Sequence, residues 1–291
     1  MLSRRCVGFV LLVLLAVAST PMGATPFELH PDVVYGHKSG MALTYDVLDP
    51  VNGNGAGVAF MVSGGWVSTW FDPSRVLGRF KALELLLDKG YTVYLVRHGS
   101  SPLFKVPDAV ADVRRALAHI REHAADYGVN PERLGVFGGS AGGHLSLMLG
   151  AASEADVGKT GTGESSRVSA VVAYFPPVDL RPIVGPNDRF PALDFDRELA
   201  DDISPVLYVS SDDAPTLLVH GTADRLVPQS TSETIHAAFE EKGVTTKLVI
   251  LEGAGHGFQG DHEAQATTEL VAWFDEHLAP RAAPEVVSTD R

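Results

Sequence analysis

The sequence has almost no cysteine and no excess of positive charge. Its one cysteine, Cys6, lies before the folded part predicted below, so that part has no disulfide and no cysteine-bound metal. The 291-residue chain carries 36 acidic and 23 basic residues, which gives a net charge of −13 at pH 7. An acidic surface repels polyanions, so nucleic acid is excluded as an expected partner. Such a charge also serves solubility.

Long hydrophobic runs are absent too, except at the amino terminus. Arg4 and Arg5 precede an unbroken apolar run over residues 7–18. A helix that spans a membrane needs about 20 apolar residues, so this run is too short for a stable membrane anchor. A basic start, a short apolar run and small residues at its end are typical of a secretory signal peptide. We expect the protein to be secreted or periplasmic.

These features give the expected boundaries of the folded part. The signal peptide is expected to end at Ala18, because the alternative, Ala24, has the bulkier Met22 where a small residue is usual. One domain is expected over residues 25–279, since a chain of this size can form a single core. Residues 280–291 have the composition of a disordered tail.

Short β-rich runs alternate with helical patterns through the middle of the chain. The central runs are continuously apolar, as expected for strands buried on both faces. The strand-like runs cover residues 41–48, 57–62, 91–96, 133–137, 169–175, 216–220 and 247–251. The helical patterns cover residues 106–127, 230–241 and 263–278. This alternation predicts an α/β fold in which helices cover both faces of a mostly parallel sheet.

One segment interrupts the alternation. Residues 178–213 contain four prolines and many aspartates, and they are longer than an ordinary connection. Phe190, Phe195, Leu199 and Tyr208 give the segment apolar side chains to bury. We therefore expect a small cap-like insertion, with a solvated loop as the alternative.

A candidate nucleophile lies in the segment Gly138-Gly139-Ser140-Ala141-Gly142, between a predicted strand and a helical pattern. The order strand, G-x-S-x-G, helix is that of a nucleophile elbow, where a strained turn exposes a serine hydroxyl. Side chains at Gly138 and Gly142 would collide with neighbouring backbone in so tight a turn. Ser140 is therefore the predicted nucleophile; without its flanking elements, the motif would equally suit a plain glycine-rich turn.

Two later residues can complete a catalytic triad. A serine hydroxyl needs a histidine base, and the histidine needs a carboxylate that orients it. Asp224 follows the strand-like run 216–220, and His256 lies in a glycine-rich loop after run 247–251. This chain order of serine, acid and histidine predicts Asp224 and His256 as partners of the nucleophile. His220 is expected to form local hydrogen bonds instead.

Several of these motifs resemble a known superfamily. Residues 220–228 (HGTADRLVP) and 255–257 (GHG) resemble the acid and histidine loops of α/β-hydrolases, closest to carboxylesterases and the prolyl-oligopeptidase-like catalytic domain. Residues 94–97 and 107–113 resemble hormone-sensitive-lipase-like and feruloyl or acetyl-xylan esterase-like enzymes. The resemblance covers about residues 40–278. It implies the α/β-hydrolase fold and a serine carboxylesterase that needs no cofactor and no metal.

The resemblance also implies an oxyanion hole made of backbone N–H groups. One donor is Ala141, directly after the nucleophile. The other comes from residues 62–66, which read VSGGW where the family usually shows His-Gly-Gly-Gly and an aromatic residue. Gly64 and Gly65 are the expected donors, with Trp66 as a rival. We expect the missing histidine to change how this loop is braced, without changing the donors.

Aromatic residues near these motifs are candidates for substrate contact. They are Trp66, Trp70 and Phe258, and core packing is the alternative role for each. The expected substrate is a small-molecule or polymer-linked ester, with acetyl, feruloyl, short-acyl and polyester groups all compatible. Two other functions fit the same residues: a small prolyl-oligopeptidase-like peptidase or amidase, and a non-catalytic binding protein on the same fold.

Overall fold

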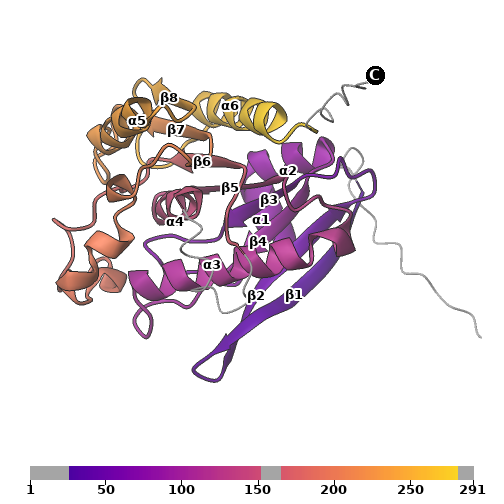
Figure 1. Cartoon of the computed structure of the whole chain (residues 1–291), viewed down its shortest axis with the longest axis horizontal. Coiled ribbons are helices and arrows are strands. Elements are labelled where there is room, and N and C mark those ends of the chain that lie inside the picture. Colours follow the sequence, from indigo (N-terminus) through magenta and orange to yellow (C-terminus); the bar gives the residue numbers. More distant parts are fainter. Residues whose placement is uncertain (1–25, 152–164, 281–291) are drawn as a thin grey trace, which may run out of the picture.

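The computed structural model describes residues 26–151 and 165–280 (Figure 1). The predicted signal peptide lies outside these residues, as does the predicted tail apart from Pro280. Within the described ranges, no helix is both long enough and apolar enough to cross a membrane.

Eight strands form one central sheet. They are β1 (Phe27–Lys38), β2 (Met41–Pro50), β3 (Gly57–Met61), β4 (Thr92–Val96), β5 (Leu134–Gly139), β6 (Ala170–Tyr174), β7 (Thr216–Gly221) and β8 (Thr246–Leu251). Their order is β1-β2-β4-β3-β5-β6-β7-β8. The β1–β2 and β2–β4 pairs are antiparallel, and every later pair is parallel. The predicted α/β class and mostly parallel sheet are confirmed.

Helices cover both faces of this sheet (Figure 1). One face carries α3 (Val106–Glu122), α4 (Ala141–Gly150) and α5 (Ser230–Lys242), and the other carries α1 (Pro73–Arg79), α2 (Lys81–Asp88) and α6 (Asp261–His277). Each face has its own hydrophobic cluster. The central strands are buried on both sides for this reason, which explains their continuous apolar sequences.

Three elements do not follow from sequence patterns: β1, α1 and α2. Strand β1 lies at the edge of the sheet, contains Pro31 and buries only Tyr35. Its pairing with β2 shifts register between His30 and Val33 and again between Val34 and Gly36. An edge strand with bulges and a mostly exposed surface has no regular alternation of apolar and polar residues, so periodicity cannot reveal it.

Residues 178–213 form a packed insertion between β6 and β7. Its four short 3-10 helices are η3 (Pro191–Leu193), η4 (Arg197–Leu199), η5 (Asp201–Ile203) and η6 (Pro205–Leu207). Its buried side chains join the cluster on the α3–α4–α5 face; they include Val178, Leu180, Val184, Leu193 and Ile203. The insertion therefore packs against α3, α4 and α5.

Candidate active site

The turn between β5 and α4 holds Ser140 in a strained backbone conformation. Its φ is 54° and its ψ is −120°, a left-handed φ that residues with side chains rarely adopt. A Cβ on Gly138 would lie 2.5 Å from the Gly142 carbonyl carbon, and a Cβ on Gly142 would lie 2.9 Å from the Met61 oxygen. The predicted collisions are therefore present, and only glycine fits at both positions. The Ser140 N–H donates to Tyr174 O at 2.9 Å.

Asp224 and His256 meet beyond the carboxyl ends of β7 and β8. His256 Nδ1 lies 2.8 Å from Asp224 Oδ2, and the carboxyl group is fully buried while the imidazole is 22% exposed. Asp224 Oδ1 accepts hydrogen bonds from the N–H groups of Leu226 at 2.8 Å and Val227 at 3.0 Å.

These contacts decide the charge of the carboxyl group and the tautomer of the imidazole. Burial raises the pKa of Asp224, but the backbone N–H groups and His256 outweigh it, and the net shift of the pKa is downward. An ionised Asp224 accepts the proton on His256 Nδ1. The other ring nitrogen, Nε2, is then free to accept a proton from a nucleophile.

Backbone hydrogen bonds between the loop after β7 and the loop after β8 hold Asp224 and His256 close together. The Thr222 N–H donates to Leu251 O at 3.1 Å, and the Ala223 N–H donates to Ala254 O at 2.9 Å. A Cβ on Gly221 would lie 2.2 Å from the Ala254 oxygen, so a side chain there would force the loops apart. Glycine at the end of β7 thus permits the approach that joins the acid to the base.

His220, at the end of β7, contacts the loop that carries Asp224. Its Nε2 donates to Val227 O at 2.9 Å, so its Nδ1 accepts from the Ser232 hydroxyl at 2.7 Å. Burial lowers the pKa of His220. The prediction of local hydrogen bonds is confirmed, and the ring positions the backbone that binds Asp224.

Phe175 lies between the nucleophile turn and the imidazole. Its ring centroid is 4.6 Å from that of His256, and its Cζ would lie 3.0 Å from a Cβ on Gly139. Gly139 and His256 line the same cavity. Because β5, β7 and β8 run parallel, Ser140 and the Asp224–His256 pair stand at the same edge of the sheet.

The sequence VSGGW forms a tight hairpin turn after β3. The Gly64 N–H donates to Val67 O at 3.0 Å, and the Val67 N–H donates to Gly64 O at 3.0 Å. Gly65 and Trp66, the two central residues, both have a φ of 57°. The Gly64 N–H is already used within the turn, which corrects its expected role as an oxyanion donor. The amides of the central residues, Gly65 and Trp66, lie outside this ladder, so the prediction for Gly65, with Trp66 as the rival, is left untouched by it.

Ala141 is the first residue of α4, where N–H groups have no partner within the helix. Its position next to Ser140 agrees with the expected second donor. The positive end of the α4 dipole lies at the same place.

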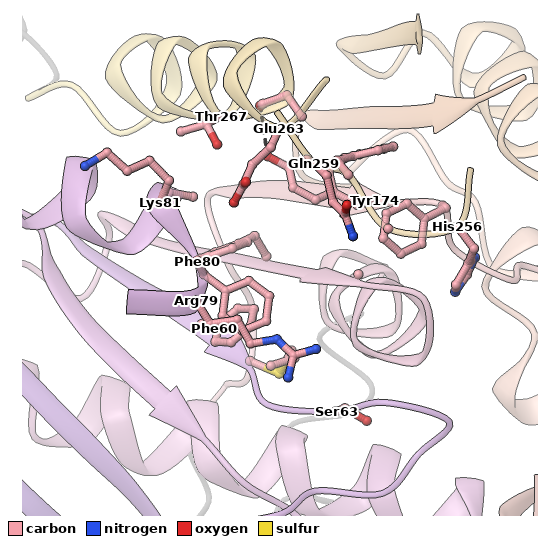
Figure 2. Close-up of a pocket in the computed structure, with 18 residues that line it drawn as sticks. Phe60, Ser63, Arg79, Phe80, Lys81, Tyr174, His256, Gln259, Glu263 and Thr267 are labelled. Atoms are coloured by element: carbon pink, nitrogen blue, oxygen red, sulfur yellow. Dashed lines mark hydrogen bonds between the residues drawn. The ribbon is translucent and has the colours of Figure 1, made fainter. Parts of the chain in front are cut away.

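A cavity of about 470 Å³ opens beside His256 (Figure 2). We call it the His256 cavity; its aromatic lining consists of Phe60, Phe80, Phe137, Tyr174, Phe175 and Phe258. Neighbouring rings pack together, with centroids 4.9 Å apart for Phe60 and Phe80 and 4.9 Å apart for Phe175 and Phe258. The lining is suited to the apolar part of an ester.

A family model described as BD-FAE matches residues 47–239, which is well over half of the chain. The chain belongs to the BD-FAE family. A second model, described as TAP-like protein, matches residues 200–282. Together with the relatives below, these matches place the chain in an α/β-hydrolase esterase family.

Relatives and solved structures agree with this family. The chain is 27% identical over 236 residues to esterase LipQ of Mycobacterium tuberculosis, covering 77% of this chain and 55% of that protein. It spans about half the length of the curated relatives that it matches first. A truncated carbohydrate esterase from gut microbiota superposes with a TM-score of 0.74 at 25% identity, covering 90% of this chain and 100% of that one. Esterase 2 of Thermogutta terrifontis gives a TM-score of 0.72 at 25% identity, covering 89% and 97%.

The three aromatic candidates have different surroundings. Trp66 is only 4% exposed, and its indole N–H donates to His144 Nδ1 at 3.2 Å, so core packing explains it and substrate contact does not. Trp70 is exposed and lines a separate hollow with Arg97. Phe258 lines the His256 cavity, where substrate contact is available to it.

In this BD-FAE member, a histidine that follows another strand braces the turn after β3. His98 follows β4 and is buried; its Nδ1 donates to Gly99 O at 2.7 Å, so its Nε2 accepts from the Ser63 hydroxyl at 2.9 Å. The pair joins the β3 and β4 loops directly before Gly64. His98 thus contacts the loop of residues 62–66, which lacks the histidine expected at its start.

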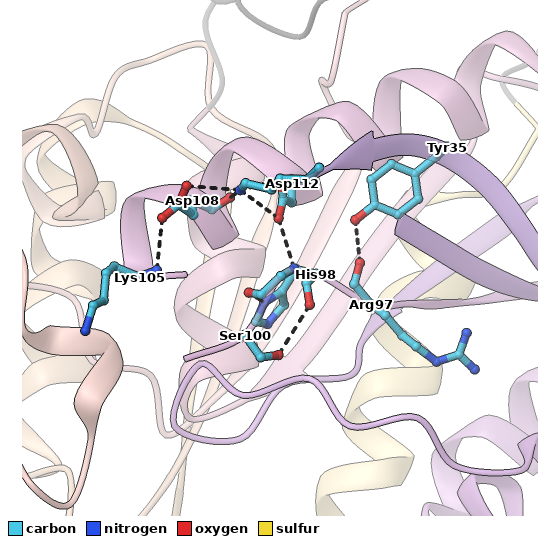
Figure 3. Close-up of polar contacts among 9 residues, drawn as sticks. Tyr35, Arg97, His98, Ser100, Lys105, Asp108 and Asp112 are labelled. Carbon is cyan, nitrogen blue, oxygen red and sulfur yellow. Dashed lines mark hydrogen bonds and ion pairs between the residues drawn. The ribbon is translucent and has the colours of Figure 1, made fainter. Parts of the chain in front are cut away.

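The loop that carries His98 is itself held by α3 (Figure 3). Asp112 of α3 is 2% exposed and accepts the Gly99 N–H at 2.9 Å and the Lys38 Nζ at 3.0 Å. Asp112 belongs to the segment 107–113 on which part of the family resemblance rests. His98 was not among the predicted site residues, although a histidine after a predicted strand, beside a loop that lacks the usual histidine, was a usable signal.

His144 joins three parts of the site. The ring lies on α4, accepts the Trp66 indole N–H at 3.2 Å, and donates from Nε2 to Ile203 O of the insertion at 2.7 Å. It is fully buried, and burial lowers its pKa to about 4. The neutral ring therefore links Trp66 of the turn after β3, helix α4 and the insertion.

This buried ring makes stability depend on pH. As pH falls below about 6.5, the unfolded chain gains a proton at His144, while the folded chain stays neutral there until about pH 4. The free energy of unfolding should therefore decrease through that window, by up to about 3 kcal/mol from this residue. Urea unfolding at pH 7 and pH 4.5, compared between wild type and His144→Gln, isolates the contribution. The variant should be less stable than wild type at pH 7, but its free energy of unfolding should decrease less between pH 7 and pH 4.5. An equal decrease in the two proteins would contradict the lowered pKa of His144.

The described residues contain no group of three or more histidine, cysteine, aspartate or glutamate side chains that could hold a metal ion.

Proposed function

We propose that this protein is an exported carboxylesterase that hydrolyses ester bonds through an acyl-enzyme on Ser140. The observation that carries the proposal is the buried Asp224–His256 pair, at 2.8 Å, at the sheet edge where a strained elbow presents Ser140. Membership of an esterase family supports ester over amide substrates.

The first half of the reaction forms the acyl-enzyme. His256 Nε2 accepts the Ser140 hydroxyl proton while the oxygen attacks the ester carbonyl carbon. Asp224 stabilises the imidazolium through Nδ1. The N–H groups of Ala141 and Gly65 donate to the negative oxygen of the tetrahedral intermediate. The intermediate then collapses, the bond to the alcohol oxygen breaks, and His256 returns its proton to the leaving alcohol.

The second half repeats these roles with water. His256 Nε2 accepts a proton from water, which attacks the acyl carbon, and the same N–H groups hold the second tetrahedral intermediate. Its collapse releases the carboxylic acid and returns the proton to Ser140. The neighbouring aromatic cavity holds one side of the ester during both steps.

Parallel assays test the choice of substrate. We expect hydrolysis of 4-nitrophenyl esters across a series of acyl lengths, and weaker turnover of aminoacyl 4-nitroanilides. The anilides are the matched amide probe, because the same chromophore leaves. Faster turnover of anilides than of esters would favour the peptidase or amidase alternative instead.

Export has its own test. The full-length chain, produced in a bacterial host, should appear outside the cytoplasm with Ser19 as its first residue, as read by amino-terminal sequencing. Leu14→Arg places a charge in the apolar run 7–18 and should retain the precursor in the cell. An unprocessed wild-type chain that stays in the cytoplasm would rule the signal peptide out.

A further inference from the structure

One exposed arginine lies on the wall of the His256 cavity. Arg79, the last residue of α1, lines the His256 cavity together with Ser63 and His256. Figure 2 shows its guanidinium pointing into the open space between Ser63 and His256. Arg79 thus shares one cavity with Ser63 of the turn after β3 and with His256.

This guanidinium has no carboxylate partner among the described residues, although the chain carries a net charge of −13. The guanidinium carbon lies 5.7 Å from the centre of the Phe80 ring. The other charged groups of the cavity lie elsewhere: Lys81 pairs with Glu84, and Figure 2 shows Glu263 on the far wall, toward Lys81. An unpaired cation in an acidic protein, aimed into the substrate cavity, points to an anionic ligand.

Arg79 also faces a second hollow. A groove along α1 shares Phe60, Ser63, Arg79 and Phe80 with the His256 cavity and continues to Arg75 and Val67. The guanidinium therefore lies where the two hollows meet. A substituent on the acyl side or on the alcohol side of a bound ester has access to it.

We propose that Arg79 binds a carboxylate of the substrate, so that the preferred esters carry a negative charge a few bonds from the scissile carbonyl. The inference rests on the proposed esterase function and adds the substrate class. A guanidinium matches the two oxygens of a carboxylate, and a charged hydrogen bond of this kind is stronger than a neutral one. The net charge of the whole chain repels anions, so a preference for them has to come from this local contact.

The test compares esters that differ only in the charge. For the acyl side, 4-nitrophenyl hemiadipate is compared with 4-nitrophenyl hexanoate; for the alcohol side, 3-acetoxybenzoate is compared with phenyl acetate. Uncatalysed hydrolysis is subtracted from each. For wild type we expect the ratio of kcat/KM, anionic over neutral, to exceed one in at least one pair, and the pair that shows it identifies the side.

Arg79→Gln should lower that ratio about tenfold, mainly through KM, and Arg79→Lys should restore part of it. Lys242→Gln is the control, since it removes one positive charge at the exposed end of α5 and lines neither hollow; its ratio should stay within about twofold of wild type. An equal loss of this ratio in both variants would mean that Arg79 acts through the long-range electrostatic field of its charge and not through contact with the substrate. That result would overturn the inference. A wild type that hydrolyses neutral esters without any anionic preference would overturn it too, leaving the esterase function intact. A wild type that hydrolyses neither ester would remove both.

Discussion

Ser140→Ala should reduce ester hydrolysis by a factor of about 10⁵ to 10⁶, the range expected when the nucleophile of a serine triad is removed. Without the hydroxyl no acyl-enzyme forms, and only the binding groups and oxyanion donors remain. The measurement is kcat for a 4-nitrophenyl ester. The amplitude of the initial burst of 4-nitrophenol counts the active sites and so excludes traces of wild-type enzyme as the source of residual activity.

The same variant should fold normally. Alanine and serine face similar backbone strain at a φ of 54°, and in the described structure the hydroxyl makes no hydrogen bond that the substitution would remove. The thermal midpoint should therefore stay within a few degrees of wild type. Ser230→Ala, on the exposed start of α5, is the matched control and should retain full activity. More than about 1% of wild-type kcat in a folded Ser140→Ala protein would remove this residue from the mechanism.

Asp224→Asn should lower kcat about 10⁴-fold while leaving the fold intact. The structure gives a specific reason. Oδ1 accepts two backbone N–H groups, from Leu226 and Val227, so an asparagine must place its carbonyl oxygen there. Its NH₂ group then faces His256 Nδ1 and donates to it, which moves the ring proton to Nε2. A protonated Nε2 cannot accept the proton of Ser140.

Two readouts separate this tautomer effect from a structural one. Activity of Asp224→Asn should recover partly at high pH, where hydroxide replaces the missing base, and circular dichroism should match wild type. The matched control is Asp213→Asn, a partly buried acid before β7 outside the described cavities, whose kcat should change by less than about twofold. Retention of kcat in Asp224→Asn would mean that another acid orients His256.

The sequence was most informative where local chemistry admits few solutions. The elbow at Ser140 follows from steric limits on Gly138 and Gly142, which the Cβ distances confirm. The seven predicted strands all exist. The central strands β3 to β7 have continuously apolar sequences because helices cover both of their faces. Asp224 and His256 were found because each follows a strand end in a glycine-containing loop.

What the sequence missed depends on contacts between distant segments. The His98–Ser63 bond joins residues 35 positions apart, and Trp66 packs against His144, 78 positions away. No spacing rule predicts either contact. The sequence alone does not distinguish Gly64 from Gly65 as a donor. Only the hydrogen bonds of the turn show that the Gly64 N–H already has a partner. Arg79 carries no motif at all; its significance comes from the cavity that β3, α1 and the His256 loop enclose.

Labelling with a fluorophosphonate tests the central claim most directly, because the reagent reacts only with a serine activated by a neighbouring base. Wild-type protein should gain one adduct per chain, and peptide mass mapping should locate it on Ser140; Asp224→Asn should react far more slowly. A folded protein that gains no adduct, or gains it on a different serine, would contradict the account.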